Sequence, residues 1–376
     1  MSLTFSWVDS DVALNSCCQL LSQSSHIAVD TEFMRSDTFF PKAALFQLSN
    51  GESHFLVDPL AISDFSPLVA LFVDPKVVKV LHSCSEDLEV FHYFLKCIPE
   101  PLIDTQVAAA LLNYGSSLGY AAIVQELLSV ELSKEETRSN WLQRPLQEKQ
   151  KIYAAQDVAF LLPVYEQLLE KLESQKRIDW LLEECSNIVS SAKMPANTDD
   201  YYLKIKLAWK LNPRQLGTLQ LLSGWRELGA RRSDVPRNHF VHEKSLWEIA
   251  KLQPSSLDDL SKISELRSKQ RQKYGDEILK LVQQGAEISD ADLPSQLPPP
   301  LSSSQKKVLA ELKEVVLEKS KAFELPVDML ARKADYEYLI RAKALGSAGS
   351  LPPRLAGWRR EIVGGALLSV VEEKLN

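Results

Sequence analysis

Short runs of hydrophobic residues near the start of the chain predict β-strands. Residues 26–33 (HIAVDTEF), 44–48 and 53–57 form such runs, and Asn50-Gly51 lies between the last two. An Asn-Gly pair between two apolar runs is typical of a tight β-hairpin. The three runs therefore predict an antiparallel meander of three strands.

Beyond the meander, predicted strands alternate with predicted helices. Helical spacing continues from Pro145 through Leu172, and proline suits the first position of a helix, so we expect one long helix there. The alternation predicts an α/β domain with a mixed sheet. The other expected elements are strands at 77–81 and 101–104 and helices at 88–95, 106–112 and 120–128.

Two polar segments that contain proline interrupt the hydrophobic pattern, at 190–200 and 289–304. Such composition is typical of linkers. We therefore expect three domains, which comprise residues 1–190, 201–290 and 301–376.

The second and third domains show helical periodicity only. Residues 222–249 align without gaps with residues 312–339, at an offset of 90 positions. Within this alignment Pro236 falls on Pro326. The pattern indicates a small helical module that has been duplicated and whose second copy has diverged.

The composition is that of an ordinary globular protein, with 376 residues, 45% hydrophobic and 25% charged. No apolar run approaches the roughly 18 residues of a membrane span, and the first residues do not resemble a secretory signal. The five cysteines form no CxxC pair, which argues against a disulfide framework and a structural zinc site. We expect a soluble, cytoplasmic protein with reduced and mostly buried thiols and no membrane partner.

Charge is distributed unevenly along the chain. Residues 1–200 contain 14 Lys and Arg against 28 Asp and Glu, whereas residues 201–290 contain 16 against 11. This asymmetry fits a protein in which one part holds cations and another contacts a polyanion. Solvated surfaces alone could produce the same asymmetry.

The first predicted strand carries two carboxylates, Asp30 and Glu32. Alternate side chains of a strand project to the same face, so these two lie side by side. Like charges in that position repel one another unless a cation lies between them, and a divalent cation with oxygen ligands fits. The alternative is a solvated strand face.

A third carboxylate, Asp87, lies at the start of a predicted helix. Ser83 and Glu86 have the spacing of a capping box, which places Asp87 in the first turn. There it heads an apolar helix face, where a carboxylate is costly to bury without a partner. Its charge could equally serve only to stabilise the helix N-terminus. We also expect Asp104 to cap the helix that follows it.

The fourth carboxylate, Asp157, follows Tyr153 by four residues on the long helix. This spacing places the phenol and the carboxylate on one helix face. A tyrosine near a metal-binding carboxylate can hold and orient a water molecule. The alternative is a core tyrosine whose hydroxyl bonds a nearby carboxylate.

Together these four acids and the tyrosine resemble the pattern of the DEDD exonucleases of the tyrosine subgroup. Five segments are similar to ribonuclease D, and the rear of the chain is similar to the helicase-and-RNase-D C-terminal (HRDC) domain. Ser83 is a departure, because glycine is common at that position in the family. The similar segments are IAVDTEF, ALFQLS, LHSCSEDLEVF, IDTQVAAALL and SNWLQRPLQEKQKIYAAQDV.

The resemblance implies the fold: an α/β RNase H-like exonuclease domain, whose mixed sheet opens with the antiparallel meander, followed by two small all-α HRDC-like domains. It also implies a 3′ to 5′ exoribonuclease that trims tRNA precursors and other structured RNAs with a free 3′ end. The products would be nucleoside 5′-monophosphates.

The resemblance further implies a role for each acid around two Mg²⁺ or Mn²⁺ ions. Asp30 would bridge the ions, Glu32 and Asp157 would complete the site that activates water, and Asp87 would support the other ion. Tyr153 would position the attacking water. No protein nucleophile and no small-molecule cofactor is needed.

Two other functions fit the same residues. A DNA exonuclease is the first, because the metal chemistry serves both sugars and nothing in these motifs reads a 2′-hydroxyl. The second is a non-catalytic nucleic-acid-binding protein with a vestigial front domain, although the presence of all four acids and the tyrosine weighs against it.

Further residues are candidates for contacts with nucleic acid. Basic side chains can neutralise phosphates, and a tryptophan can meet a base, but charge runs are often solvated and a tryptophan beside a helix often packs. The candidates are His82, Trp141, Arg144, Arg231, Arg232 and Arg237.

Overall fold

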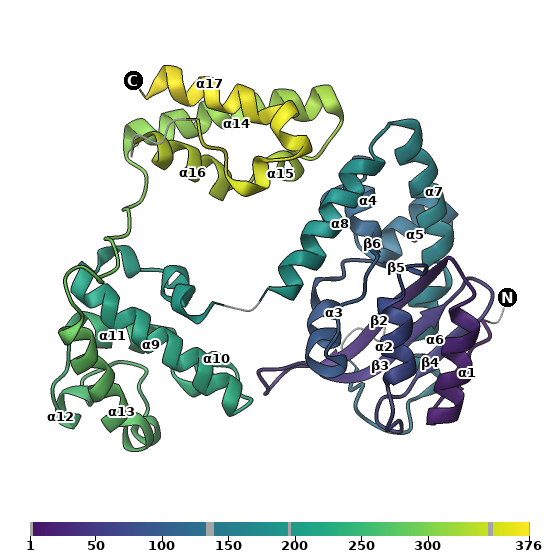
Figure 1. Ribbon diagram of the computed structural model, residues 1–376, viewed down its shortest axis with the longest axis horizontal. Coiled ribbons are helices and arrows are strands. Elements are labelled where there is room, and N and C mark those ends of the chain that lie inside the picture. The colour runs from purple at the N-terminus through teal and green to yellow at the C-terminus, as the bar shows by residue number, and fades with distance from the viewer. Residues whose placement is uncertain (1–2, 133–138, 195–196, 345–348, 376) are drawn as a thin grey trace. The chain divides into compact units, whose positions relative to one another are not determined.

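The computed structural model describes all residues except 1–2, 133–138, 195–196, 345–348 and 376 (Figure 1). The chain forms two compact units, and each is described by itself. The first comprises residues 1–34, 42–194 and 301–376, and the second comprises residues 35–41 and 195–300.

A six-stranded mixed sheet is the centre of the first unit, with strand order β1-β4-β3-β2-β5-β6. The expected antiparallel meander is confirmed, because β3 pairs antiparallel with both β2 and β4. Strands β1, β5 and β6 add to it in parallel. The sequence pattern missed β1, which is only three residues long. The strands are β1 (Ser6–Val8), β2 (His26–Met34), β3 (Lys42–Ser49), β4 (His54–Val57), β5 (Val78–Leu81) and β6 (Leu102–Asp104).

Helices cover both faces of this sheet. Val29 of β2 belongs to one core cluster, with Leu14, Leu68 and Leu88 from helices α1, α2 and α3. Its neighbour Ala28 belongs to the opposite cluster, which includes residues of α4, α5, α6 and α7. Strand β2 is therefore central and buried on both faces. The helices are α1 (Asp11–Leu21), α2 (Ser66–Val73), α3 (Ser85–Val90), α4 (Thr105–Leu111), α5 (Tyr120–Leu128), α6 (Glu148–Ala159) and α7 (Leu161–Ser174).

The single long helix expected from Pro145 to Leu172 is wrong in two respects. Helix α6 begins at Glu148, where Gln147 and Gln150 form a capping box, so Pro145 lies before the helix. The helical region is also divided at Phe160, which ends α6 and precedes α7. Pro163 explains the break, because proline has no N–H to donate and its ring clashes with the carbonyl four residues earlier.

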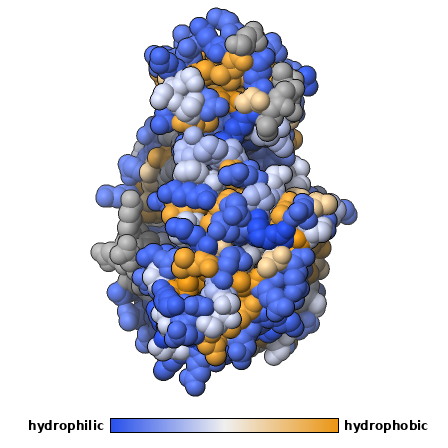
Figure 2. Space-filling model, turned by 90° about the vertical axis from the view of Figure 1, so that its left-hand side faces the viewer, coloured by the Kyte–Doolittle hydropathy of each residue, from blue (hydrophilic) through white to orange (hydrophobic). Residues whose placement is uncertain are grey.

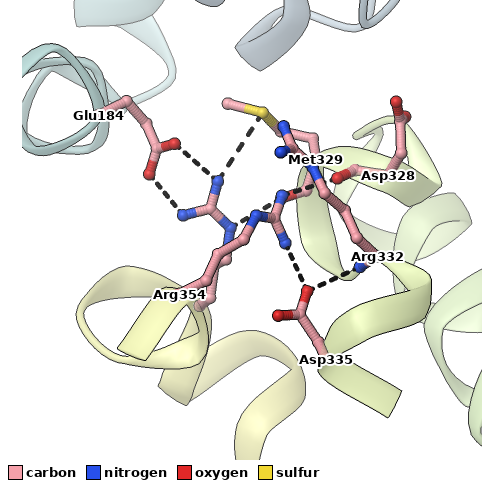
Figure 3. A network of polar contacts seen from close by, with 7 residues as sticks. Glu184, Asp328, Met329, Arg332, Asp335 and Arg354 are labelled. Carbon is pink, nitrogen blue, oxygen red and sulfur yellow. Dashed lines mark hydrogen bonds and ion pairs between the residues drawn. The ribbon is translucent and has the colours of Figure 1, made fainter. Parts of the chain in front are cut away.

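The C-terminal module, residues 301–376, packs on helix α8 (Ile178–Lys193) within the first unit. The rings of Trp180 and Trp358 stack at 4.7 Å, and the buried Arg359 guanidinium pairs with the Glu184 carboxylate. Figure 3 shows the polar network around this contact, in which Arg354 reaches Asp335 at 2.9 Å. The module contains α14 (Ser303–Phe323), α15 (Val327–Leu330), α16 (Lys333–Ala344) and α17 (Gly365–Lys374).

The second unit is helical, and its first three helices match the C-terminal module. Helices α9, α10 and α11 begin 90 residues before α14, α15 and α16, respectively. This equals the offset of the sequence repeat and supports a duplication. The boundaries of the three expected domains stay a prediction. The helices of this unit are α9 (Pro213–Arg232), α10 (Arg237–Phe240), α11 (Glu243–Leu252), α12 (Leu257–Leu260) and α13 (Ser268–Glu287).

The surface shown in Figure 2 is hydrophilic over most of its area, with apolar residues in small groups. Within the described residues, no helix combines the length and the apolar character needed to cross a membrane. All five cysteines are free thiols, as expected, and only Cys97 among them is not fully buried.

Candidate active site

Strand β2 presents Asp30 and Glu32 on the face that carries Ala28, beneath α6 and α7. Asp30 lies opposite Gln47 of β3, and Glu32 lies opposite Leu45. The ladder stays regular up to a bulge between Glu32 and Phe33. The alternation that places the two carboxylates side by side therefore holds up to the bulge.

The capping box expected from Ser83 and Glu86 is wrong. Helix α3 begins at Ser85 after the N-cap residue Cys84, which makes no side-chain cap. Ser83 instead adopts a left-handed conformation with φ of 62°. Glycine adopts this region without steric cost, which fits the glycine that the family resemblance implies at this position.

The Asp104 carboxylate accepts three backbone hydrogen bonds. Its carboxylate accepts the backbone N–H of Gln106 at 2.8 Å and so caps α4, as expected. It also accepts the backbone N–H groups of Ser83 and Cys84 at 2.9 and 3.0 Å. Asp104 thereby fixes the turn that precedes α3 and its first-turn carboxylate.

Asp87 lies in the first turn of α3, as expected, and is only 7% exposed. The hydroxyl of Thr31 donates a hydrogen bond to its carboxylate. Thr31 stands between Asp30 and Glu32 on β2, so this bond ties α3 to the strand that carries the other two acids. No sequence signal pointed to Thr31.

Burial and mutual repulsion raise the pKa of all four acids. Burial raises the pKa of Asp30, and Asp157 raises it further. Burial also raises the pKa of Asp87, and the charge of Asp30 adds to this rise. Burial likewise raises the pKa of Asp157, and the charge of Glu32 adds to it. The pKa of Glu32 rises to about 9, through burial first and then through Asp30 and Asp87. The structure thus brings the four acids into one electrostatic cluster.

Tyr153 adjoins this cluster on the same helix as Asp157. Burial, followed by the charges of Asp157 and Glu32, raises the pKa of its phenol above the ordinary value. The hydroxyl therefore keeps its proton at neutral pH and can donate a hydrogen bond. The ring of Trp141 lies beside it, with centroids 6.0 Å apart.

The chemistry of this donor set fits a divalent cation. Four carboxylates offer hard oxygen ligands, and a cation would relieve the repulsion that adds to the rise of their pKa values by burial. In the part of the chain that the structure describes, no three His, Cys, Asp or Glu side chains already converge as the ligands of one ion. The electrostatic coupling of the acids, rather than a preformed coordination geometry, is what indicates a metal site.

His82 does not offer a free group to nucleic acid. Its Nδ1 lies 2.9 Å from the Thr105 hydroxyl, and its Nε2 lies 2.9 Å from the carbonyl oxygen of Leu118. Burial lowers its pKa. These bonds join the residue after β5 to the loop before α5, and the contact with nucleic acid expected from the sequence stays a prediction.

Trp141 and Arg144 also have partners within the protein, and their expected contacts with base and phosphate stay predictions. Trp141 is 2% exposed and packs in a core cluster with Leu56 and Ala155. The Arg144 guanidinium makes two bonds to the Asp58 carboxylate, at 2.7 and 2.6 Å, and also donates to the Trp141 carbonyl at 2.7 Å. Both residues secure the segment that leads into α6.

In the second unit, Arg231 and Arg237 also form hydrogen bonds within the protein. Both bond the carboxylate of Glu227, which is 1% exposed, and both guanidinium groups lie over the ring of Phe39, at 5.2 and 4.7 Å. A buried carboxylate is their partner within the protein, and their expected contacts with phosphate stay a prediction. Arg232 is exposed, and its phosphate contact stays a prediction.

The sequence pattern missed Tyr120, the first residue of α5. Its hydroxyl donates to the backbone carbonyl of Gln156 at 2.9 Å, next to Asp157. Its pKa is raised by burial and by the charges of Asp157 and Asp30, which shows how near it lies to the acids. A tyrosine after a glycine, as in Gly119-Tyr120, carries no sequence signal for such a role.

Known proteins resemble the whole chain. Residues 5–173 match the 3′-5′ exonuclease domain family, and residues 215–282 match the HRDC domain. Ribonuclease D of Pseudomonas paraeruginosa is 40% identical over 366 residues, which cover 97% of each chain. Ribonuclease D of Escherichia coli K12 is 35% identical over 373 residues, which cover 99% of each chain.

A solved structure agrees with these matches. The crystal structure of Escherichia coli RNase D, described as an exoribonuclease involved in structured RNA processing, superposes with a TM-score of 0.92 over 99% of both chains at 34% identity. The RNase H-like exonuclease fold followed by a helical HRDC domain is thereby confirmed, and RNA is the class of polymer that the chain binds. This chain belongs to the ribonuclease D family of 3′–5′ exoribonucleases.

Proposed function

We propose that this exoribonuclease trims the 3′ ends of tRNA precursors and other structured RNAs in the cytoplasm and releases nucleoside 5′-monophosphates. The observation that carries the proposal is the cluster of Asp30, Glu32, Asp87 and Asp157, in which partial or full burial, followed by mutual repulsion, raises the pKa of each acid. Exonucleases of this family generally depend on divalent metal ions. We assign this cluster to two such ions, Mg²⁺ or Mn²⁺.

Each residue then has a defined task. Asp30 would bridge both ions, Glu32 and Asp157 would complete one site, and Asp87 would support the other. When bound, the ions would stabilise charge on the attacking and leaving oxygens of the phosphodiester. Tyr153, which keeps its proton, would hold the attacking water by a hydrogen bond and aim it in line with the leaving 3′ oxygen of the chain.

Substrate choice tests this function directly. We expect a 5′-labelled tRNA precursor with a 3′ extension to be shortened to the mature end in Mg²⁺ or Mn²⁺, with 5′-monophosphates as products. A single-stranded DNA of the same sequence, incubated in parallel, is the control, and EDTA should stop the reaction. Equal degradation of the DNA would contradict RNA as the preferred substrate, and an untouched tRNA precursor would contradict the substrate proposed.

Tyr153→Phe should slow cleavage but not abolish it. The substitution removes one hydroxyl and no metal ligand, so we expect kcat to fall about 10- to 100-fold, the range typical of groups that orient species around a metal site. Single-turnover rates on a short RNA measure the effect. A Tyr153→Phe enzyme as inactive as one that lacks a carboxylate would give the tyrosine a larger role than orienting water.

Affinity for structured RNA should come chiefly from basic residues outside the acidic exonuclease domain. Residues 201–290 have an excess of basic side chains, and Lys269 and Lys273 are exposed one turn apart on α13. We expect the Lys269→Gln/Lys273→Gln variant to bind tRNA more weakly than wild type. The slope of log affinity against log salt concentration should become smaller by roughly 0.7 to 0.9 for each lost phosphate contact.

The matched control for this salt experiment is Lys306→Gln/Lys307→Gln, which removes two exposed lysines from α14. Binding of labelled tRNA is followed across a salt series at constant Mg²⁺. If both double variants show the wild-type slope, Lys269 and Lys273 are solvated residues that do not contact phosphate.

A further inference from the structure

Helix α6, which carries both Tyr153 and Asp157, ends at Ala159. Pro163 prevents the helix from continuing, and the N–H of Phe160 turns to the carbonyl of Val158. In an uninterrupted helix that N–H would bond the carbonyl of Gln156, four residues earlier. The Gln156 carbonyl, adjacent to Asp157, therefore loses its regular partner.

Tyr120 supplies the missing partner from another helix. Its hydroxyl donates to the Gln156 carbonyl at 2.9 Å. The hydroxyl thus replaces the Phe160 N–H as the donor to the Gln156 carbonyl, as side chains do where they enter a helical hydrogen-bond ladder.

The loop that carries Tyr120 is itself anchored. The Leu118 carbonyl oxygen lies 2.9 Å from His82 Nε2 and accepts a hydrogen bond from Gln106 Nε2 at 3.1 Å. The His82 ring also lies 5.7 Å from the Tyr120 ring. Contacts from His82, which follows β5, and from Gln106 of α4 therefore fix the position of Tyr120. Its hydroxyl in turn bonds the last turn of α6.

We propose that Tyr120 is a positioning residue for Asp157: its hydroxyl fixes the broken end of α6 and so sets the direction of the Asp157 carboxylate. The role rests on the proposed metal function of the four acids. Asp157 lies two residues before the last residue of α6, so its direction depends on how that last turn is held. Tyr120 itself touches the backbone and not the substrate.

Tyr120→Phe removes the hydroxyl and keeps the ring. Groups that orient metal ligands typically change metal affinity or activity 10- to 100-fold, so we expect Mn²⁺ to bind about tenfold more weakly by calorimetry. The kcat at limiting Mn²⁺ should fall by a similar factor, and an excess of Mn²⁺ should restore it. KM for a short RNA should stay within about twofold, because no substrate contact is lost.

Tyr114→Phe is the matched control, because it removes a phenol whose oxygen accepts from Lys171 Nζ at 2.6 Å, away from the acids. Hydrogen exchange of the amides at 156–162 gives a readout independent of activity: it should become faster in Tyr120→Phe and stay unchanged in Tyr114→Phe.

The outcomes separate this role from the metal function itself. If wild type binds Mn²⁺ and Tyr120→Phe binds it equally, the positioning role is refuted and the metal site stands. A loss of kcat that excess Mn²⁺ does not restore also refutes the role. If wild type binds no Mn²⁺, the metal assignment falls, and the role of Tyr120 falls with it.

Discussion

The Asp30→Asn variant is expected to lose RNA cleavage by about 10³-fold or more while it keeps its fold. Asparagine retains the size of the side chain but lacks the charge that would bridge two cations. Bound ions would contribute several kcal/mol to stabilising charge in the transition state, and each 1.4 kcal/mol corresponds to a factor of ten. Single-turnover cleavage of a short RNA in excess enzyme measures the loss.

Asp9→Asn is the control for this variant, because Asp9 is an exposed acid that lies outside the cluster. It should cleave RNA at the wild-type rate. Circular dichroism and thermal unfolding should show that both variants are folded. Cleavage by Asp30→Asn within tenfold of wild type would contradict the assignment of Asp30 as the bridging ligand.

Removal of divalent ions should make the protein less stable as the pH rises. The pKa of Glu32 is raised in the folded chain from 4.5 to about 9, and the other three acids shift in the same direction. The folded state therefore binds more protons than the unfolded state between these pH values. Stability present below pH 4.5 is lost as the pH rises toward 9.

Bound cations should reverse this loss. Their ligands must be deprotonated, so Mn²⁺ should raise the unfolding temperature more at pH 8 than at pH 5. At 100 times the dissociation constant, one ion adds about 2.7 kcal/mol, which corresponds to roughly 5 °C or more for a domain of this size. Thermal scans in EDTA and in Mn²⁺ at both pH values measure the difference.

Asp30→Asn provides an internal check on the same experiment. In EDTA at pH 8 it should unfold at a temperature equal to or above that of wild type, because it removes one of the repelling charges. It should also respond less to Mn²⁺. An unfolding temperature in EDTA that does not change between pH 5 and pH 8 would show that the acids do not repel one another as the structure indicates.

The carboxylates could be predicted from the sequence because their arrangement is local. Strand alternation alone places Asp30 beside Glu32, and helical spacing alone places Tyr153 on the face of Asp157. The meander could be predicted for the same reason, through its Asn50-Gly51 turn. Only the convergence of these separate elements required the resemblance to a known family.

The contacts of the basic and aromatic candidates could not be predicted, because they depend on partners far away in the sequence. Arg144 bonds Asp58 across 86 residues, and Arg237 lies over Phe39 from nearly two hundred residues away. Residue type shows that an arginine can bind an anion, but not which anion. A buried carboxylate and a phosphate satisfy the guanidinium equally well.

The break between α6 and α7 did have a signal in the sequence. Pro163 stands in the first turn of α7, where a missing N–H costs nothing, and it prevents a continuous helix through Phe160. Apolar periodicity continues across the break, which is why the pattern predicted a single helix. The break determines the last turn of α6, and with it the surroundings of Asp157.

One time course tests the central claim, that the acidic cluster hydrolyses RNA from its 3′ end with divalent ions. Uniformly labelled linear RNA with a 3′-hydroxyl, the same RNA with a 3′-phosphate and a circular form are incubated in Mn²⁺ or EDTA. We predict a ladder that shortens by one nucleotide at a time, only from the free 3′-hydroxyl and only with Mn²⁺. Internal cuts in the circle, or equal degradation in EDTA, would contradict the account.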